Sequence, residues 1–133
     1  MFGFFGKKGG LRIATSNLKK QYGLTLDKTP NKRSIIDNFE RMSAEATLSA
    51  EAQTALLYRL VVMNYLAAAS IMRNSGEIID PSRLLWLTEL ADASVDWSEK
   101  ANDHVTLEEL TSPLNMNIFR FFEFLGIHYG GPA

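Results

Sequence analysis

Histidine and acidic side chains are the residues of this chain that could support catalysis or metal binding. The two histidines, His104 and His128, do not stand at HExxH spacing, and the chain has no cysteine that could complete a zinc site. The lack of cysteine also excludes disulfides and a thiol nucleophile. We therefore expect both histidines to be structural or solvated.

Four acidic residues in the second half recur at steps of four, three and four residues. They are Asp92, Asp96, Glu99 and Asp103. On one helix they would form a stripe of carboxylates, which Mg²⁺ or Ca²⁺ could bind. EF-hand spacing is absent, however, and a helix face of like charges is usually hydrated. We expect no metal site and no cofactor.

The chain also lacks the common catalytic motifs. It has no GxSxG nucleophile motif, and GKKGG at residues 6–10 lacks the GxxxxGK[ST] pattern of a phosphate-binding loop. We interpret this glycine-rich segment as a flexible joint. No residue is predicted to be catalytic, and a small helical enzyme with an unrecognised site is the third of our hypotheses.

The N-terminal segment, MFGFFGKKGG, is rich in aromatic residues. Phe2, Phe4 and Phe5 precede Lys7 and Lys8. Each phenylalanine left in water forgoes about 2–3 kcal/mol of burial free energy. We therefore expect the three rings to be covered by their own domain, a second copy of the chain, another protein or a membrane surface. The glycines make the segment bendable, as an inserted arm would need to be.

More aromatic residues that could contact a partner lie in the second half. Two tryptophans stand eleven residues apart, which is three turns of one helix, and four phenylalanines occur within six residues near the C-terminus. Tryptophans on one helix face are more often core residues, but they also anchor interfaces. The phenylalanines surround most of a helix, so at least one should face away from the domain. The predicted partner-binding residues of this half are Trp86, Trp97, Phe119, Phe122 and Phe124.

Charge is divided unevenly along the chain. Residues 1–41 hold nine Lys/Arg and three Asp/Glu, whereas residues 42–133 hold five Lys/Arg and twelve Asp/Glu, within a net charge of −1. The basic residues are spread out rather than packed into one block, so we expect them to be balanced by the acidic part of the same or another copy. Nucleic-acid binding is not favoured, because the net charge is slightly negative and no recognition-helix pattern is present.

Apolar residues recur every three or four positions along most of the chain, which predicts helices. Residues 50–74 are apolar around nearly their whole circumference, so this helix should be surrounded by others. Its most apolar run, residues 60–72, is 13 residues long, whereas a membrane-spanning helix needs about 20. No long stretch alternates with period two, and no βαβ pattern is present. The fold class is therefore predicted to be all-α.

Capping and turn residues predict where these helices begin and end. The predicted starts are Ser34 with Asp37, Asp80 with Pro81, Thr106 with Glu109, and Ser112 with Pro113. The predicted ends are Gly23, Gly76 and Gly126. Residues 47–49 leave two possibilities open, a break between two helices or one continuous helix.

Taken together, the sequence predicts a single-domain bundle of five or six helices around a buried central helix at about residues 50–74. Residues 1–10 form the N-terminal aromatic and basic arm, and residues 11–133 form the helical domain. The leading hypothesis is a non-enzymatic protein–protein interaction protein (an assembly subunit, adaptor or small chaperone) that binds a protein partner or forms a homo-oligomer. The alternative is a peripheral membrane protein that docks through the arm. No secretory signal is visible, because the lysines follow the short apolar patch instead of preceding it. We therefore expect a cytoplasmic location or one peripheral to a membrane.

Overall fold

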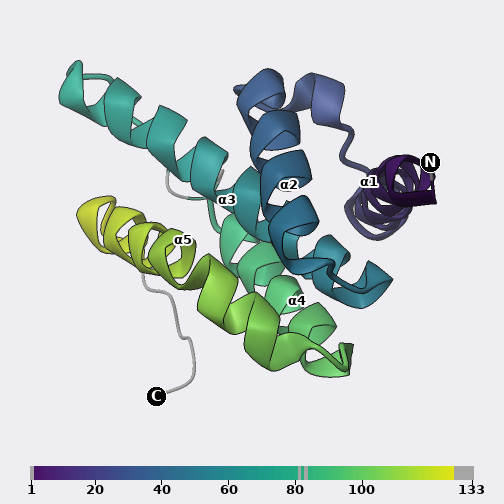
Figure 1. Ribbon diagram of the computed structural model, residues 1–133. Helices are drawn as coiled ribbons and strands as arrows, with labels where there is room; N and C mark the ends of the chain where they lie inside the picture. The colour runs from purple at the N-terminus through teal and green to yellow at the C-terminus, as the bar shows by residue number, and fades with distance from the viewer. Residues whose placement is uncertain (1, 81, 83, 128–133) are drawn as a thin grey trace.

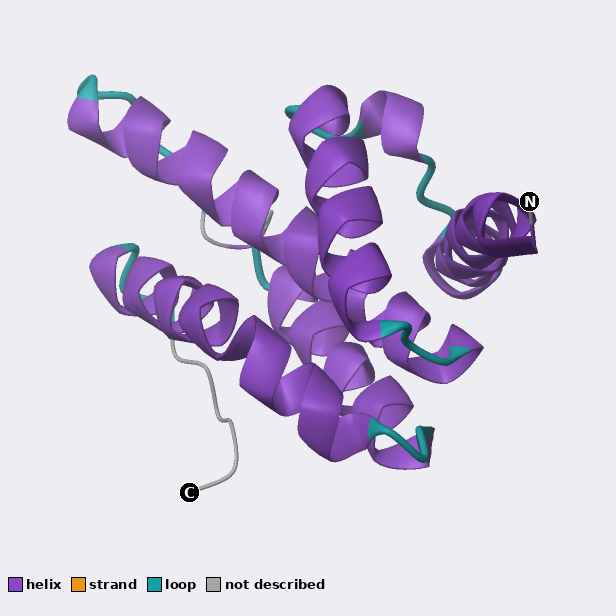
Figure 2. Ribbon diagram, viewed as in Figure 1, coloured by secondary structure: helices purple, strands orange, loops and turns teal. Residues whose placement is uncertain are grey.

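The computed structural model describes residues 2–80, 82 and 84–127, with side chains from Gly10 onward. Every regular element in this part of the chain is a helix, which confirms the predicted all-α class (Figure 1, Figure 2). The elements in chain order are α1 (Phe2–Tyr22), the short 3-10 helix η1 (Leu26–Lys28), α2 (Lys32–Ala46), α3 (Ala50–Asn74), α4 (Trp86–Lys100) and α5 (His104–Phe124).

Helix α3 is the centre of the bundle, as predicted. It packs against each of the other four α-helices, and residues 54–62 are all buried, on every side of the helix. The Ser49 hydroxyl caps its first turn by accepting a hydrogen bond from the Ala52 N–H at 3.3 Å. The apolar circumference read from the sequence therefore reflects a helix enclosed by its own domain.

Helix α1 begins at Phe2, so the backbone of the predicted arm is helical and the flexible joint at residues 6–10 is not observed. Gly10 lies on the buried side of this helix, where it meets α3. A methyl group in its place would lie 1.6 Å from the Gln53 Oε1 atom, so a larger residue at position 10 would require the Gln53 side chain to move. The side chains of Phe2, Phe4, Phe5, Lys7 and Lys8 lie outside the described residues.

The first loops differ in part from the predicted boundaries. Helix α2 begins at Lys32, after Asn31 in a left-handed conformation (φ 58°), so the predicted Ser34 cap is wrong. The Ser34 hydroxyl instead accepts a hydrogen bond from the Asn38 side chain. Thr47 also has a positive φ, 49°, which breaks the helix before Ser49 and decides the alternative that the sequence left open.

Helix α4 begins at Trp86, later than predicted. The Asp80 carboxylate accepts hydrogen bonds from the Ser82 N–H at 3.0 Å and hydroxyl at 2.8 Å, which forms a turn rather than the first turn of α4. Pro81, the other half of the predicted signal, lies outside the described residues.

Helix α5 runs without interruption through both starts that were predicted inside it. Thr106 is already in the first turn, and Pro113 lies in the middle of the helix. Proline removes one backbone hydrogen bond and is unfavourable there. Buried residues on either side of it, including Leu107 and Ile118, pack α5 into the core, and this packing overrides the local signal.

Candidate functional site

The predicted partner residues of α5 point to different places. Phe119 is 49% exposed and lines a cavity, and Phe124 is also partly exposed. Phe122, also predicted to contact a partner, is only 1% exposed and belongs to the core. It lies four residues after Ile118, on the same buried face of the helix. The Arg73 guanidinium lies 5.0 Å from the Phe124 ring and joins the ends of α3 and α5.

The two tryptophans are half-buried and join helices inside the bundle. The Trp86 ring packs edge-to-face on Tyr65 of α3 at 5.1 Å. The Trp97 Nε1–H donates to the Gln21 Oε1 atom at 3.3 Å, and the Tyr58 hydroxyl donates to the same oxygen at 2.5 Å. Burial raises the Tyr58 pKa to about 12. These contacts give both tryptophans a packing role and do not test a partner contact.

An apolar groove is formed by the C-terminal part of α3 together with residues 28–30 and residues 78–80 and 84. We name it the α3 groove; its apolar lining is Pro30, Tyr65, Ala68, Ala69, Met72, Ile78, Ile79 and Leu84. The groove has a volume of about 480 Å³. Ile78 is 98% exposed, the largest exposed fraction among the large apolar residues that the structure describes. Met72 is exposed beside it.

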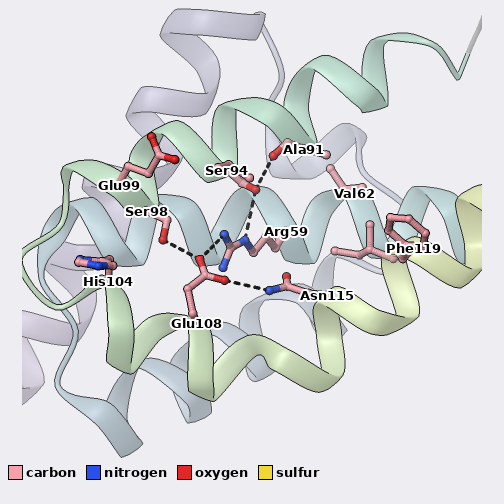
Figure 3. A pocket seen from close by; sticks show the side chains of 12 residues that line it. Arg59, Val62, Ala91, Ser94, Ser98, Glu99, His104, Glu108, Asn115 and Phe119 are labelled. Carbon is pink, nitrogen blue, oxygen red and sulfur yellow. Dashed lines mark hydrogen bonds and ion pairs between the residues drawn. The ribbon is translucent and has the colours of Figure 1, made fainter. Parts of the chain in front are cut away.

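A polar network is buried where α3, α4 and α5 meet (Figure 3). At its centre is the Arg59 side chain, which is 4% exposed. Its Nε atom donates to the Ser94 hydroxyl at 3.2 Å, one terminal nitrogen donates to the Thr111 hydroxyl at 2.9 Å, and the other donates to Glu108 Oε1 at 2.7 Å. A single side chain of α3 thus holds both α4 and α5.

Glu108 balances the charge of Arg59 and extends the network. Its Oε1 atom also accepts a hydrogen bond from the Ser98 hydroxyl at 2.7 Å, and its Oε2 atom accepts one from the Asn115 amide at 3.3 Å. Burial raises the pKa of the Glu108 carboxyl, but the hydrogen bonds from Ser98 and Arg59 and the Arg59 charge outweigh it, so the pKa lies below its usual value. The carboxylate is therefore ionised at neutral pH.

A cavity of about 360 Å³ lies beside this network. Arg59, Ser98, Glu108 and Asn115 line its polar side, and Phe119 lines its apolar end together with aliphatic residues. In Figure 3 the Glu108 carboxylate points toward Arg59, His104 lies near one end and Phe119 lies near the other. This combination of apolar walls and a few convergent polar groups is typical of small-molecule sites.

This network was not predicted from the sequence, although its residues carry a signal. Arg59 interrupts a long apolar helix at a position that must be buried. Ser94 and Ser98 are four residues apart, and Glu108, Thr111 and Asn115 follow at steps of three and four, so each set lies on one helix face. These polar faces could have been matched to the buried arginine, but the pairing of helices was needed to do so.

A second polar contact joins the starts of α3 and α5. The Asp103 carboxylate accepts hydrogen bonds from the Ser49 N–H at 2.8 Å and from the Ser49 hydroxyl at 2.6 Å. Burial raises the Asp103 pKa, but these hydrogen bonds outweigh it and hold the pKa below its usual value. The adjacent His104 ring contacts the Ala101 carbonyl through Nδ1 at 3.2 Å. The N-terminal ends of the two helices are thereby fixed together.

Two further features bear on metals and membranes. Within the described part of the chain, no group of three or more His, Asp or Glu residues is placed to hold a metal ion. Helix α3 is long and apolar enough to cross a membrane, but 67% of its most apolar stretch is buried inside the structure. The core helix of a globular protein can be equally long and apolar, so length and composition do not distinguish a core helix from a membrane-spanning one.

The chain was also compared with known proteins. No protein-family model, no curated protein and no solved structure matches it.

The Arg59 network predicts that removal of one charge destabilises the bundle. In the variant Glu108→Gln, Arg59 keeps its charge in a buried position but loses its carboxylate, and we expect a loss of roughly 2–4 kcal/mol in the free energy of unfolding. A fully buried pair would lose more, but the Glu108 side chain is 44% exposed, so water can partly solvate Arg59 in the variant. Urea denaturation followed by circular dichroism measures it. Glu109→Gln, on the exposed side of α5, is the matched control and should change little; equal midpoints for the two variants would contradict the prediction.

The Asp103–Ser49 contact predicts a pH-dependent stability. Because the native pKa of Asp103 is lowered, its contribution is present above the unfolded-state pKa of about 3.9 and is lost as the pH falls through the native value. We expect Asp103→Asn to be about 1 kcal/mol less stable than wild type at pH 7, with the difference vanishing in strong acid. Thermal unfolding from pH 2 to 7 measures the effect, with the exposed Asp92→Asn as control. A deficit that is the same at every pH would refute it.

Proposed function

We propose that this chain is a non-enzymatic helical protein that acts by binding another protein, as an assembly subunit, adaptor or small chaperone. The observation that carries the proposal is the α3 groove, which is lined by two exposed large apolar side chains, Met72 near the end of α3 and Ile78 in the segment that follows it. Each such side chain gains about 1.5–3 kcal/mol when it is removed from water. A contiguous apolar surface of this kind is typical of interaction sites.

The shape of the groove favours an amphipathic helix as its occupant. Ala68 and Ala69 are small and lie on α3 between the larger Tyr65 and Met72, so a helix could approach the α3 backbone closely. Lys28 and Asp80 are the only charged residues that line the groove in the described part of the chain. The occupant would therefore present small and apolar residues at helical spacing.

The membrane-docking alternative is favoured by one observation. The backbone from Phe2 onward is helical, and a helix that carries phenylalanines and lysines is a form in which interfacial segments bind membranes. A small enzyme remains the third hypothesis. Its best site would be the Arg59 cavity. However, the lowered pKa of Glu108 keeps this carboxylate ionised at neutral pH, which does not favour it as a proton donor.

A pair of glutamate substitutions tests the proposed function. Ala68→Glu or Ile78→Glu would place a charge in the α3 groove, and we expect either change to weaken partner binding by at least about tenfold, since burying an unpaired charge is costly. The chain would be purified from its own cells with the proteins that accompany it, and their amounts and the native mass from light scattering would be compared.

The matched control is Val105→Glu, at an apolar position on α5 that is 59% exposed and lies outside the groove. It should retain the partner. Equal partner recovery and equal mass for the groove and control variants would overturn the proposal. Flotation of the chain with anionic vesicles, reduced by Phe4→Ser and Phe5→Ser together, would support membrane docking in its place.

A further inference from the structure

The cavity beside Arg59 has an excess of negative charge. Glu99 and Glu108 line it with two carboxylates, whereas Arg59 is its only guanidinium or ammonium group among the described lining residues. Arg59 directs its hydrogen bonds to Ser94, Thr111 and Glu108 and is already paired with the last of these. An anion entering the cavity would therefore face two carboxylates and an arginine whose charge is balanced.

Acceptor atoms, in contrast, have capacity left. A carboxylate oxygen accepts about two hydrogen bonds, and among the described residues Glu108 Oε2 accepts a single long one, at 3.3 Å from Asn115. The Asn115 amide donates through its nitrogen to Glu108 and Thr111, which leaves its oxygen as an acceptor. A group with several N–H donors and a positive charge would complete these bonds.

The other end of the cavity is apolar. Figure 3 shows Val62 and Phe119 at the end away from His104, and Val95 and Ile118 also line the cavity. Phe119 is half-exposed and sits where a ligand ring could cover it. The volume of about 360 Å³ lies within the range of small-ligand sites.

We propose that this cavity binds a small protonated organic amine with an aromatic or branched apolar body. The ammonium group would lie against the Glu108 and Asn115 oxygens, with Glu99 adding attraction at the rim, and the apolar body would pack on Phe119 and Ile118. This site is separate from the α3 groove, since the two share no lining residue. The proposed ligand site can therefore be tested independently of the proposed function.

Three probes of similar shape and different charge test the proposal. 2-Phenylethylamine, 2-phenylethanol and phenylacetate would each be titrated into the isotopically labelled chain, with backbone amide shifts followed by NMR. We expect the amine to bind with a dissociation constant of about 1 mM or tighter and at least about fivefold more tightly than phenylacetate. The shifts should centre on the parts of α4 and α5 that line the cavity.

Two variants on half-exposed or exposed positions keep the test independent of the buried network. Phe119→Ser should weaken the amine at least about threefold, and Glu99→Gln about two- to fivefold, the range of a partly screened charge. Phe124→Ser and Asp96→Asn, on the same helices but outside the cavity lining, are the controls and should bind as wild type does. No saturable binding of the amine, equal or tighter binding of phenylacetate, or no effect of Phe119→Ser would overturn the inference.

Discussion

The need to pair one buried charge constrains how this bundle is assembled. Arg59 lies in the middle of an otherwise apolar helix, and an unpaired guanidinium there would cost several kcal/mol. Ser94 of α4 and Glu108 and Thr111 of α5 satisfy it together. Apolar packing alone would tolerate small rotations of α4 and α5 on α3, whereas three directed hydrogen bonds fix their register.

The two halves of α3 have different surroundings. Over residues 54–62 it is enclosed by its own domain, and its apolar and polar groups are both used internally. Beyond Ser70, Ile71 and Met72 are exposed, and in Figure 1 this end of α3 extends away from α1 and α2. Buried packing therefore accounts for the first part of the apolar sequence, and the α3 groove offers a use for the remainder. The proposed partner site and the proposed ligand site depend on different parts of α3.

The sequence predicts this fold best where local and tertiary signals agree. The structure confirms the predicted central helix at about residues 50–74 and its end before Gly76, whereas the sequence left its start open between a break at residues 47–49 and a continuous helix. Local signals fail in two places: Pro113 does not interrupt α5, and Gly10 lies within α1, next to the Gln53 side chain, instead of in a flexible joint. The Arg59 network could not be predicted, because its members lie 35–52 residues from the arginine and meet only after the helices pair. Phe122, which was predicted among the partner-binding residues, lies in the core, because the phenylalanines surround most of the helix and the sequence does not show which of them face inward.

A double-mutant cycle between Arg59 and Glu108 measures this central interaction most directly. The free energies of unfolding of wild type, Arg59→Met, Glu108→Gln and the double variant would be compared at neutral pH. If the pair organises the three helices, the two changes will be non-additive by at least about 1.5 kcal/mol, with the double variant more stable than the sum of the single losses predicts. Additivity within about 0.3 kcal/mol would contradict the account.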